Sequence, residues 1–421
     1  MSSSQPDDGL IGLRPVEEHW PAGVMANEAH QDPLGFMKAR NFKLAVVEFD
    51  DQGRCYDRGQ LGEVSDAIEH LRETRTDAIV LVFVHGWKHD ARSDDDNLNS
   101  FRQVLDKTAL HERRCVQEGK ARDVYGIFVG WRGLTAYGVG GVVEDTTFWG
   151  RQEAGHRVAT GSVRELFGRL RHWRNSVRKN GGSPLLVISG HSFGGMIVFS
   201  ALAQSLIEAA SEPVGHVIPG FADLVLLVNP AIEGARYLPI HDLVSDEAYK
   251  SRADCQLPVF ICIQARNDQP VGTFFPIGNA KNRLEESSIG NLEKRCVSHA
   301  IGFIDEFHTH DISGPAGSNP FVLTPPQIRR ADPFWVIHAS KEVIDGHGGI
   351  WQDPFLSFLA AVLFQHVNVS RAVVKKGSLA GSLEFDINDK SRTALPATTG
   401  NLADFARTIE DPPKEGPPRD R

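Results

Sequence analysis

Apolar runs alternate along the chain with stretches in which apolar residues recur at helical spacing. The run Ala78–Val84 (AIVLVFV) is apolar throughout and rich in β-branched residues, which is typical of a strand buried on both faces of a parallel sheet. Similar runs predict strands at residues 43–50, 124–129, 184–188, 223–228, 259–263 and 334–337. Helices are predicted between them, at residues 62–74, 98–114, 151–178, 196–210 and 355–365. This alternation predicts an α/β fold with a doubly wound, mostly parallel sheet and helices on both faces.

The two ends of the chain lack this pattern. Residues 1–40 are rich in Pro, Gly and acidic residues and are predicted to form a loosely ordered N-terminal arm. Residues 371–421 turn polar and finish in a Pro-rich stretch, which predicts a disordered C-terminal tail. The predicted folded domain therefore spans residues 41–370, with long excursions at about 133–182 and 269–333.

Composition narrows the possible classes of protein. A hydrophobic fraction of 41% and a charged fraction of 24% are ordinary for a soluble globular chain. The net charge of -9 argues against a nucleic-acid partner, and no apolar run approaches the roughly 20 residues of a membrane span. The N-terminus shows no secretory signal, and five cysteines without CxxC spacing favour reduced thiols, so we expect a cytoplasmic protein. The oligomeric state is left open.

One serine stands in a context that favours nucleophilic chemistry. Ser192 lies in Gly190-His191-Ser192-Phe193-Gly194, between the predicted strand 184–188 and the predicted helix 196–210. A tight strand-to-helix turn can expose a serine hydroxyl beside a base. Glycines two residues before and two after the serine are required there, because strand and helix approach too closely for a Cβ atom. Ser192 is therefore the candidate nucleophile.

Together with three further features, this motif resembles the α/β-hydrolase fold of the esterase and lipase type. In the strand numbering of that fold, in which Ala78–Val84 is the third strand, His85-Gly86-Trp87 follows the third strand, an acid follows the seventh, and a histidine follows the last. The resemblance spans roughly residues 40–370. Many members carry a cap between the sixth and seventh strands, but here Ala231–Leu257 is short. We therefore expect the two long excursions to cover the substrate.

The resemblance implies a triad in the chain order nucleophile, acid, histidine. Asp268 follows the strand at 259–263 and precedes Gln269-Pro270, so it is the candidate acid. A turn aspartate that caps its own loop would give the same pattern. Glu233, after the sixth strand, is the reserve candidate.

The candidate base is His347, in the loop Asp345-Gly346-His347-Gly348-Gly349 between the last strand and the closing helix. His338 directly follows apolar strand residues and is interpreted as a packed histidine. His308 and His310 form a His-x-His pair, which without further spaced ligands is typical of a polar strand or loop. No metal site is predicted.

The backbone N–H groups of Phe193 and Trp87 are the expected oxyanion hole, since such enzymes use the residue after the nucleophile and a loop after the third strand. Three aromatic residues in the first excursion could line an acyl pocket, although ordinary local packing explains them equally well. They are Tyr137, Phe148 and Trp149.

These features lead to the hypothesis of a serine hydrolase that cleaves small carboxylic esters through an acyl-enzyme and needs no cofactor. The same triad serves thioesterases, amidases and peptidases. A non-catalytic hydrolase-like protein that only binds a ligand is a further alternative.

Overall fold

The structure is a computed structural model of the chain. It describes residues 26–31, 37–86, 89, 91, 95–115, 121–131, 142–212, 218, 220–245, 257–274, 290–317, 319–325 and 333–375.

Within these residues the strands form one ten-stranded sheet of order β1-β2-β4-β3-β5-β6-β7-β10-β8-β9. The edge strands β1 and β9 are antiparallel to their neighbours, and all other pairs are parallel. The strands are β1 (Ala26–Gln31), β2 (Met37–Phe49), β3 (Ala78–Val84), β4 (Asp123–Trp131), β5 (Leu185–His191), β6 (Leu224–Val228), β7 (Phe260–Ala265), β8 (His310–Ser313), β9 (Val322–Thr324) and β10 (Phe334–Ala339).

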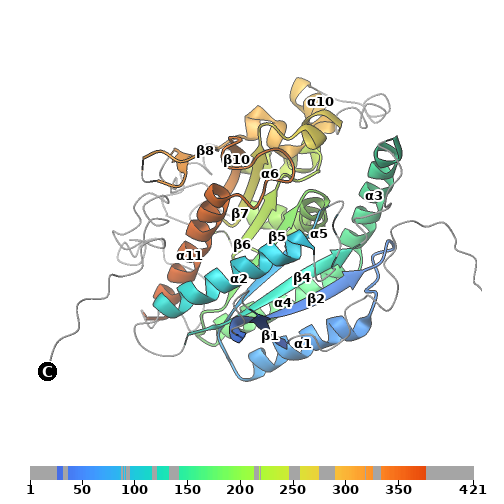
Figure 1. Cartoon of the computed structure of the whole chain (residues 1–421). Coiled ribbons are helices and arrows are strands. Elements are labelled where there is room, and N and C mark those ends of the chain that lie inside the picture. The colour runs from blue at the N-terminus through green and yellow to red at the C-terminus, as the bar shows by residue number, and fades with distance from the viewer. Residues whose placement is uncertain are drawn as a thin grey trace, which may run out of the picture.

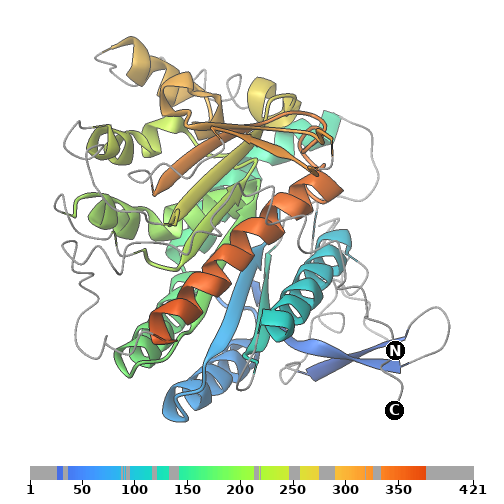
Figure 2. The ribbon, with the colours of Figure 1, turned by 90° about the vertical axis from the view of Figure 1, so that its left-hand side faces the viewer.

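Helices cover both faces of the sheet (Figure 1). On one face, α2 and α11 lie side by side, as Figure 2 also shows. They share an apolar core with the strands. On the other face, α1, α4 and α5 contribute to a second core. The helices are α1 (Arg58–Glu73), α2 (Asp96–Cys115), α3 (Val142–Thr160), α4 (Val163–Lys179), α5 (Phe193–Ala210), α6 (Leu238–Val244), α10 (Asn291–Ser298) and α11 (Asp353–Lys375). Short helical turns lie at η2 (Gly234–Arg236), η3 (Pro270–Phe274), η4 (Ile301–Phe303) and η5 (Asp305–Phe307).

The predicted fold class is confirmed. Each of the seven predicted strands is present, and the sheet is mostly parallel between two helical layers. The arrangement is that of an α/β-hydrolase fold, in which β3, β5, β7 and β10 carry the loops that the sequence singled out. Helix α5 is long and apolar enough to cross a membrane, but 67% of that stretch is buried inside the protein. It is the central core helix behind the candidate nucleophile.

Three sequence expectations differ from the structure. The N-terminal arm is not loosely ordered throughout, because β1 pairs with the first half of β2 from residue 26 onwards. The helix expected at 151–178 is two helices, α3 and α4, separated at Gly161 and Ser162. Part of the second excursion extends the sheet, since β8 pairs with β10 and β9 pairs with β8. The tail beyond residue 375 lies outside the described residues, and α11 continues past residue 370.

Candidate active site

Ser192 lies at the sharp turn between β5 and α5. Its backbone adopts φ 56° and ψ -122°, a strained conformation that L-residues rarely adopt and that is expected of a nucleophile turn. A Cβ atom on Gly190 would lie 2.5 Å from the carbonyl oxygen of Gly194, and one on Gly194 would lie 2.1 Å from that of Val84. Both glycines are therefore required by the close approach of β5, α5 and the end of β3.

The structure brings Ser192, His347 and Asp268 together in one hydrogen-bonded chain. Ser192 Oγ lies 2.7 Å from His347 Nε2, and His347 Nδ1 lies 2.8 Å from Asp268 Oδ2. The carboxylate is buried, whereas the imidazole keeps 21% of its side-chain surface exposed. With Nδ1–H donating to the carboxylate, Nε2 is the acceptor for the serine proton, which is the tautomer that a general base requires.

Two other groups hold the Asp268 carboxylate. The backbone N–H of Val271 donates to Oδ1 at 3.1 Å, and the side-chain amide of Gln264 donates to Oδ2 at 2.8 Å. Gln264 lies on β7 and is buried. Asp268 therefore does cap its own loop, as a turn aspartate does, while its other oxygen faces His347. The geometry of a turn aspartate and the contact expected of the candidate acid are thus both present at this residue.

The loop that carries His347 is fixed by two side chains that the sequence analysis missed. Asn229, which follows β6, donates to the backbone carbonyls of Gly346 at 3.2 Å and His347 at 2.9 Å. Its side-chain oxygen accepts from the N–H of Ala265, so it joins the acid loop to the histidine loop. His191 Nε2 also lies 2.9 Å from the His347 carbonyl.

The His347 carbonyl can only accept, so His191 donates this hydrogen bond and carries a proton on Nε2. Complete burial holds the pKa of His191 well below its usual range, and the neighbouring His347 lowers it further. The two imidazole rings lie 4.9 Å apart. A second positive charge beside the candidate base is thereby avoided.

The loop after β3 passes directly against the nucleophile. A Cβ atom on Gly86 would lie 3.0 Å from Ser192 Cβ, so only glycine fits there. His85 anchors this loop, because its Nδ1 lies 2.8 Å from the Gly86 carbonyl and its Nε2 accepts from the N–H of Trp131 at 3.0 Å. Phe193 begins α5, where backbone N–H groups point out of the helix end. Trp87 lies outside the described residues.

The alternative candidates lie in other surroundings. Glu233 forms an ion pair with Arg236 and accepts from Gln152, with no bond to His347. His338 lies on β10 and stacks on His308, with ring centroids 4.2 Å apart. Its pKa is lowered chiefly by burial. His310 is buried against Trp335 on the opposite face of the strand from His308.

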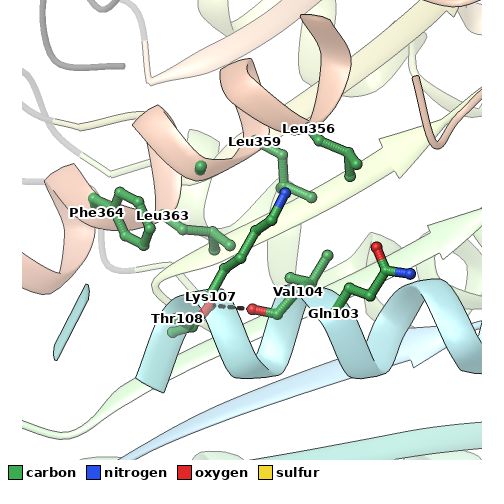
Figure 3. Close-up of a pocket in the computed structure, with 9 residues that line it drawn as sticks. Gln103, Val104, Lys107, Thr108, Leu356, Leu359, Leu363 and Phe364 are labelled. Carbon is green, nitrogen blue, oxygen red and sulfur yellow. Dashed lines mark hydrogen bonds between the residues drawn. The ribbon is translucent and has the colours of Figure 1, made fainter. Parts of the chain in front are cut away.

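The predicted acyl-pocket residues are only partly described. Phe148 and Trp149 lie on α3, but their side chains and the whole of Tyr137 fall outside the described residues. A groove between α2 and α11 is lined by apolar side chains such as Leu359 and Leu363, with Lys107 reaching across it (Figure 3). Neither this groove nor the apolar cavity next to it is lined by a triad residue, so we do not assign either to the substrate.

No protein-family model matches the chain, and no curated protein matches it significantly. Among solved structures, the chain is similar to brefeldin A esterase, described as a bacterial homologue of human hormone-sensitive lipase. The identity is 13%, with 72% of this chain and 70% of that chain covered and a TM-score of 0.28. It is also similar to the phospholipase PlaB from Legionella pneumophila in complex with thio-NAD, at 12% identity, with 73% and 67% covered and a TM-score of 0.32. Because the identities and TM-scores are this low, these similarities do not establish a function for the chain.

Proposed function

We propose that the protein is a serine hydrolase that cleaves small carboxylic esters through an acyl-enzyme intermediate. The observation that carries this proposal is the hydrogen-bonded chain from Ser192 Oγ through His347 to the buried Asp268. A site that only binds a ligand has no need for a strained serine, an oriented imidazole and a buried carboxylate in series.

The proposed reaction follows from the direction of these bonds. Ser192 Oγ attacks the ester carbonyl carbon while its proton passes to His347 Nε2. The resulting oxyanion is stabilised by the backbone N–H of Phe193 and a second N–H from the loop after Gly86, proposed as that of Trp87. His347 then protonates the departing alcohol, which leaves Ser192 acylated.

Water completes the cycle in the same geometry. His347 takes a proton from the water that attacks the acyl carbon, and the bond from the acyl carbon to Ser192 Oγ breaks. The serine recovers its proton, the carboxylic acid leaves, and no cofactor is consumed. Throughout, Asp268 remains ionised and stabilises the imidazolium that forms twice in each cycle.

The decisive experiment is active-site labelling of the full chain with a fluorophosphonate probe. We expect stoichiometric labelling of Ser192, found by mass spectrometry of the tryptic peptide, and none in Ser192→Ala. Ser189→Ala is the matched control, because Ser189 lies in β5, which leads into the Ser192 turn, and donates to the Val82 carbonyl instead. Folded wild-type protein that does not label would leave the ligand-binding alternative as the better reading.

Turnover on a panel of p-nitrophenyl esters of increasing chain length, with matched thioesters and anilides, separates the ester proposal from thioesterase, amidase or peptidase activity. A cytoplasmic location is also proposed. It is supported by Cys55, Cys262 and Cys296, which are free thiols in the structure.

A further inference from the structure

A cluster of two histidines and one carboxylate lies outside the catalytic chain, where β8 pairs with β10. His308 precedes β8, Asp311 lies on β8, and His338 lies on β10. Their ligand atoms all lie within 4.8 Å of one another. The strands β8 and β10 are adjacent in Figure 1, and their parallel register pairs His338 with Asp311, so these two side chains project from the same face of the sheet.

The nitrogen atoms that face this cluster have no hydrogen-bond partner. Nε2 of His308 and Nε2 of His338 are buried in the structure and form no hydrogen bond. Buried polar nitrogens of this kind are costly unless something else satisfies them. His308 Nε2 lies 3.4 Å from Asp311 Oδ2, close to that oxygen without forming a hydrogen bond to it.

The distance of 3.4 Å between His308 Nε2 and Asp311 Oδ2 fits two ligands of a shared metal ion better than a direct hydrogen bond. Ligand atoms at about 2.0–2.1 Å from a tetrahedral zinc ion lie about 3.4 Å from each other. The ring of His338 stacks on that of His308, and each residue has a ligand atom within 4.8 Å of those of the other two. The side chains of His308 and Asp311 are 27% and 42% exposed, so an ion can enter and a water molecule can complete the shell.

We propose that His308, Asp311 and His338 form a zinc-type divalent metal site with two imidazole ligands, one carboxylate ligand and one open position. The sequence analysis predicted no metal here, because it tested only the His308 and His310 pair. His338 lies 30 residues from His308 in the sequence, and only the β8–β10 pairing brings the two together.

Arg266 is the cation nearest to the proposed ligands. Its guanidinium forms an ion pair with Asp311 Oδ1, the oxygen that faces away from His308. Since Arg266 is 61% exposed, it can give way when an ion binds to Oδ2. Its positive charge nevertheless opposes a cation, and removing that charge should tighten binding.

The test uses the full chain, stripped of metal with a chelator and then titrated with Co²⁺ or Zn²⁺. We expect one equivalent of Co²⁺ to bind with the visible absorption of a tetrahedral site, and Zn²⁺ to displace it and raise Tm. His308→Gln and His338→Gln should each weaken binding by at least about 100-fold, while Arg266→Gln should strengthen it several-fold. His70→Gln is the matched control, since His70 is exposed on α1, and it should bind as the wild type does.

Circular dichroism shows which variants are folded, and Asp311→Asn, on a partly exposed strand, replaces any histidine variant that is not. Folded wild-type protein that takes up no Co²⁺ at micromolar metal overturns the proposal, as does binding that both histidine variants retain. These readouts do not involve ester turnover, so the metal site and the hydrolase proposal can fail separately.

Discussion

At the scale of single residues, the site depends on the placement of protons on two neighbouring imidazoles. His347 bonds to both Asp268 and Ser192 and has to cycle between neutral and charged forms during the proposed reaction. His191, buried beside it with a lowered pKa, stays neutral and holds the His347 backbone. The lowered pKa of His191 keeps a second positive charge away from the candidate base.

Asp268→Asn tests the role of the carboxylate. The amide preserves shape but cannot balance the imidazolium and favours the wrong tautomer, so kcat should fall about 10⁴-fold with the fold intact. The measurement is kcat on the best ester of the panel, together with Tm. Glu233→Gln, which alters the reserve carboxylate, should remain near wild type. A crippled Glu233 variant beside an active Asp268 variant would mean that the acid is misassigned.

Asn229→Gly tests the hydrogen bonds from the Asn229 amide that hold the loop of His347. Asn229 has φ 45°, so glycine preserves the backbone conformation while removing the amide that donates to Gly346 and His347. We expect kcat to fall about 10- to 100-fold with little change in KM, because a small misplacement of the base is costly. A fall in Tm that accompanies the fall in kcat would instead indicate a general structural role.

At the scale of elements, the break between α3 and α4 shows how a local sequence pattern can mislead. Residues 151–178 read as one helix, yet the chain turns at Gly161 and Ser162, where the N–H of Ser162 donates to the carbonyl of Gly53 at 2.7 Å. The two residues of this contact are more than a hundred positions apart in the sequence, so helical spacing alone cannot predict it. The turn allows α3 to lean on α5 and α4 to pack beside α1.

Gly161→Ala should therefore destabilise the protein. A Cβ atom there would lie 2.1 Å from the Gly53 carbonyl oxygen, and the two backbones would have to separate, at a cost of about 1–3 kcal/mol. Gly168→Ala is the matched control, because this glycine lies inside α4 with open space around it. It should stabilise the protein by up to about 1 kcal/mol through helix propensity. Urea unfolding of both variants measures the difference, and an equal effect at the two positions would contradict the contact.

The difference between local patterns and contacts over long sequence distances also explains how much of the site the sequence could predict. The β5–Ser192–α5 turn is local, and the positions of Asp268 and His347 follow from strand ends in a known chain order. Asn229 and His191 went unnoticed because their partner is a backbone carbonyl more than a hundred residues away, which no side-chain pattern encodes. Short strands such as β8, of four residues, are too brief to show a period.

At the scale of the whole molecule, the candidate active site and a buried cluster of charged residues lie at opposite ends of the parallel strands. The loops at the carboxyl ends of β5, β7 and β10 carry the proposed triad of Ser192, Asp268 and His347. Near the opposite ends, before β6, Asp223 is buried between Arg174 and Arg178 and accepts from the N–H of Leu186. Burial alone would raise the pKa of Asp223, but the two arginines hold it below its usual value. Substitutions at this end should change stability while leaving the active-site geometry intact.

His366 provides the test at this scale. It lies on α11 near Asp223, and complete burial lowers its pKa from 6.5 to about 4. Between these two pH values the unfolded chain binds a proton that the native protein excludes, so acidification favours unfolding. The contribution of His366 to stability is therefore complete above pH 6.5 and is lost as the pH falls towards 4, by up to about 3 kcal/mol.

His366→Gln removes this titration, so the free energy of unfolding should decline less between pH 6.5 and 4 than it does in the wild type. The measurement is urea unfolding at several pH values in this window, with His70→Gln, an exposed histidine on α1, as control. Because His366 lies at the end of the sheet remote from Ser192, fluorophosphonate labelling at neutral pH should be unchanged. Parallel pH profiles in the His366 variant and the wild type would show that another group governs acid unfolding.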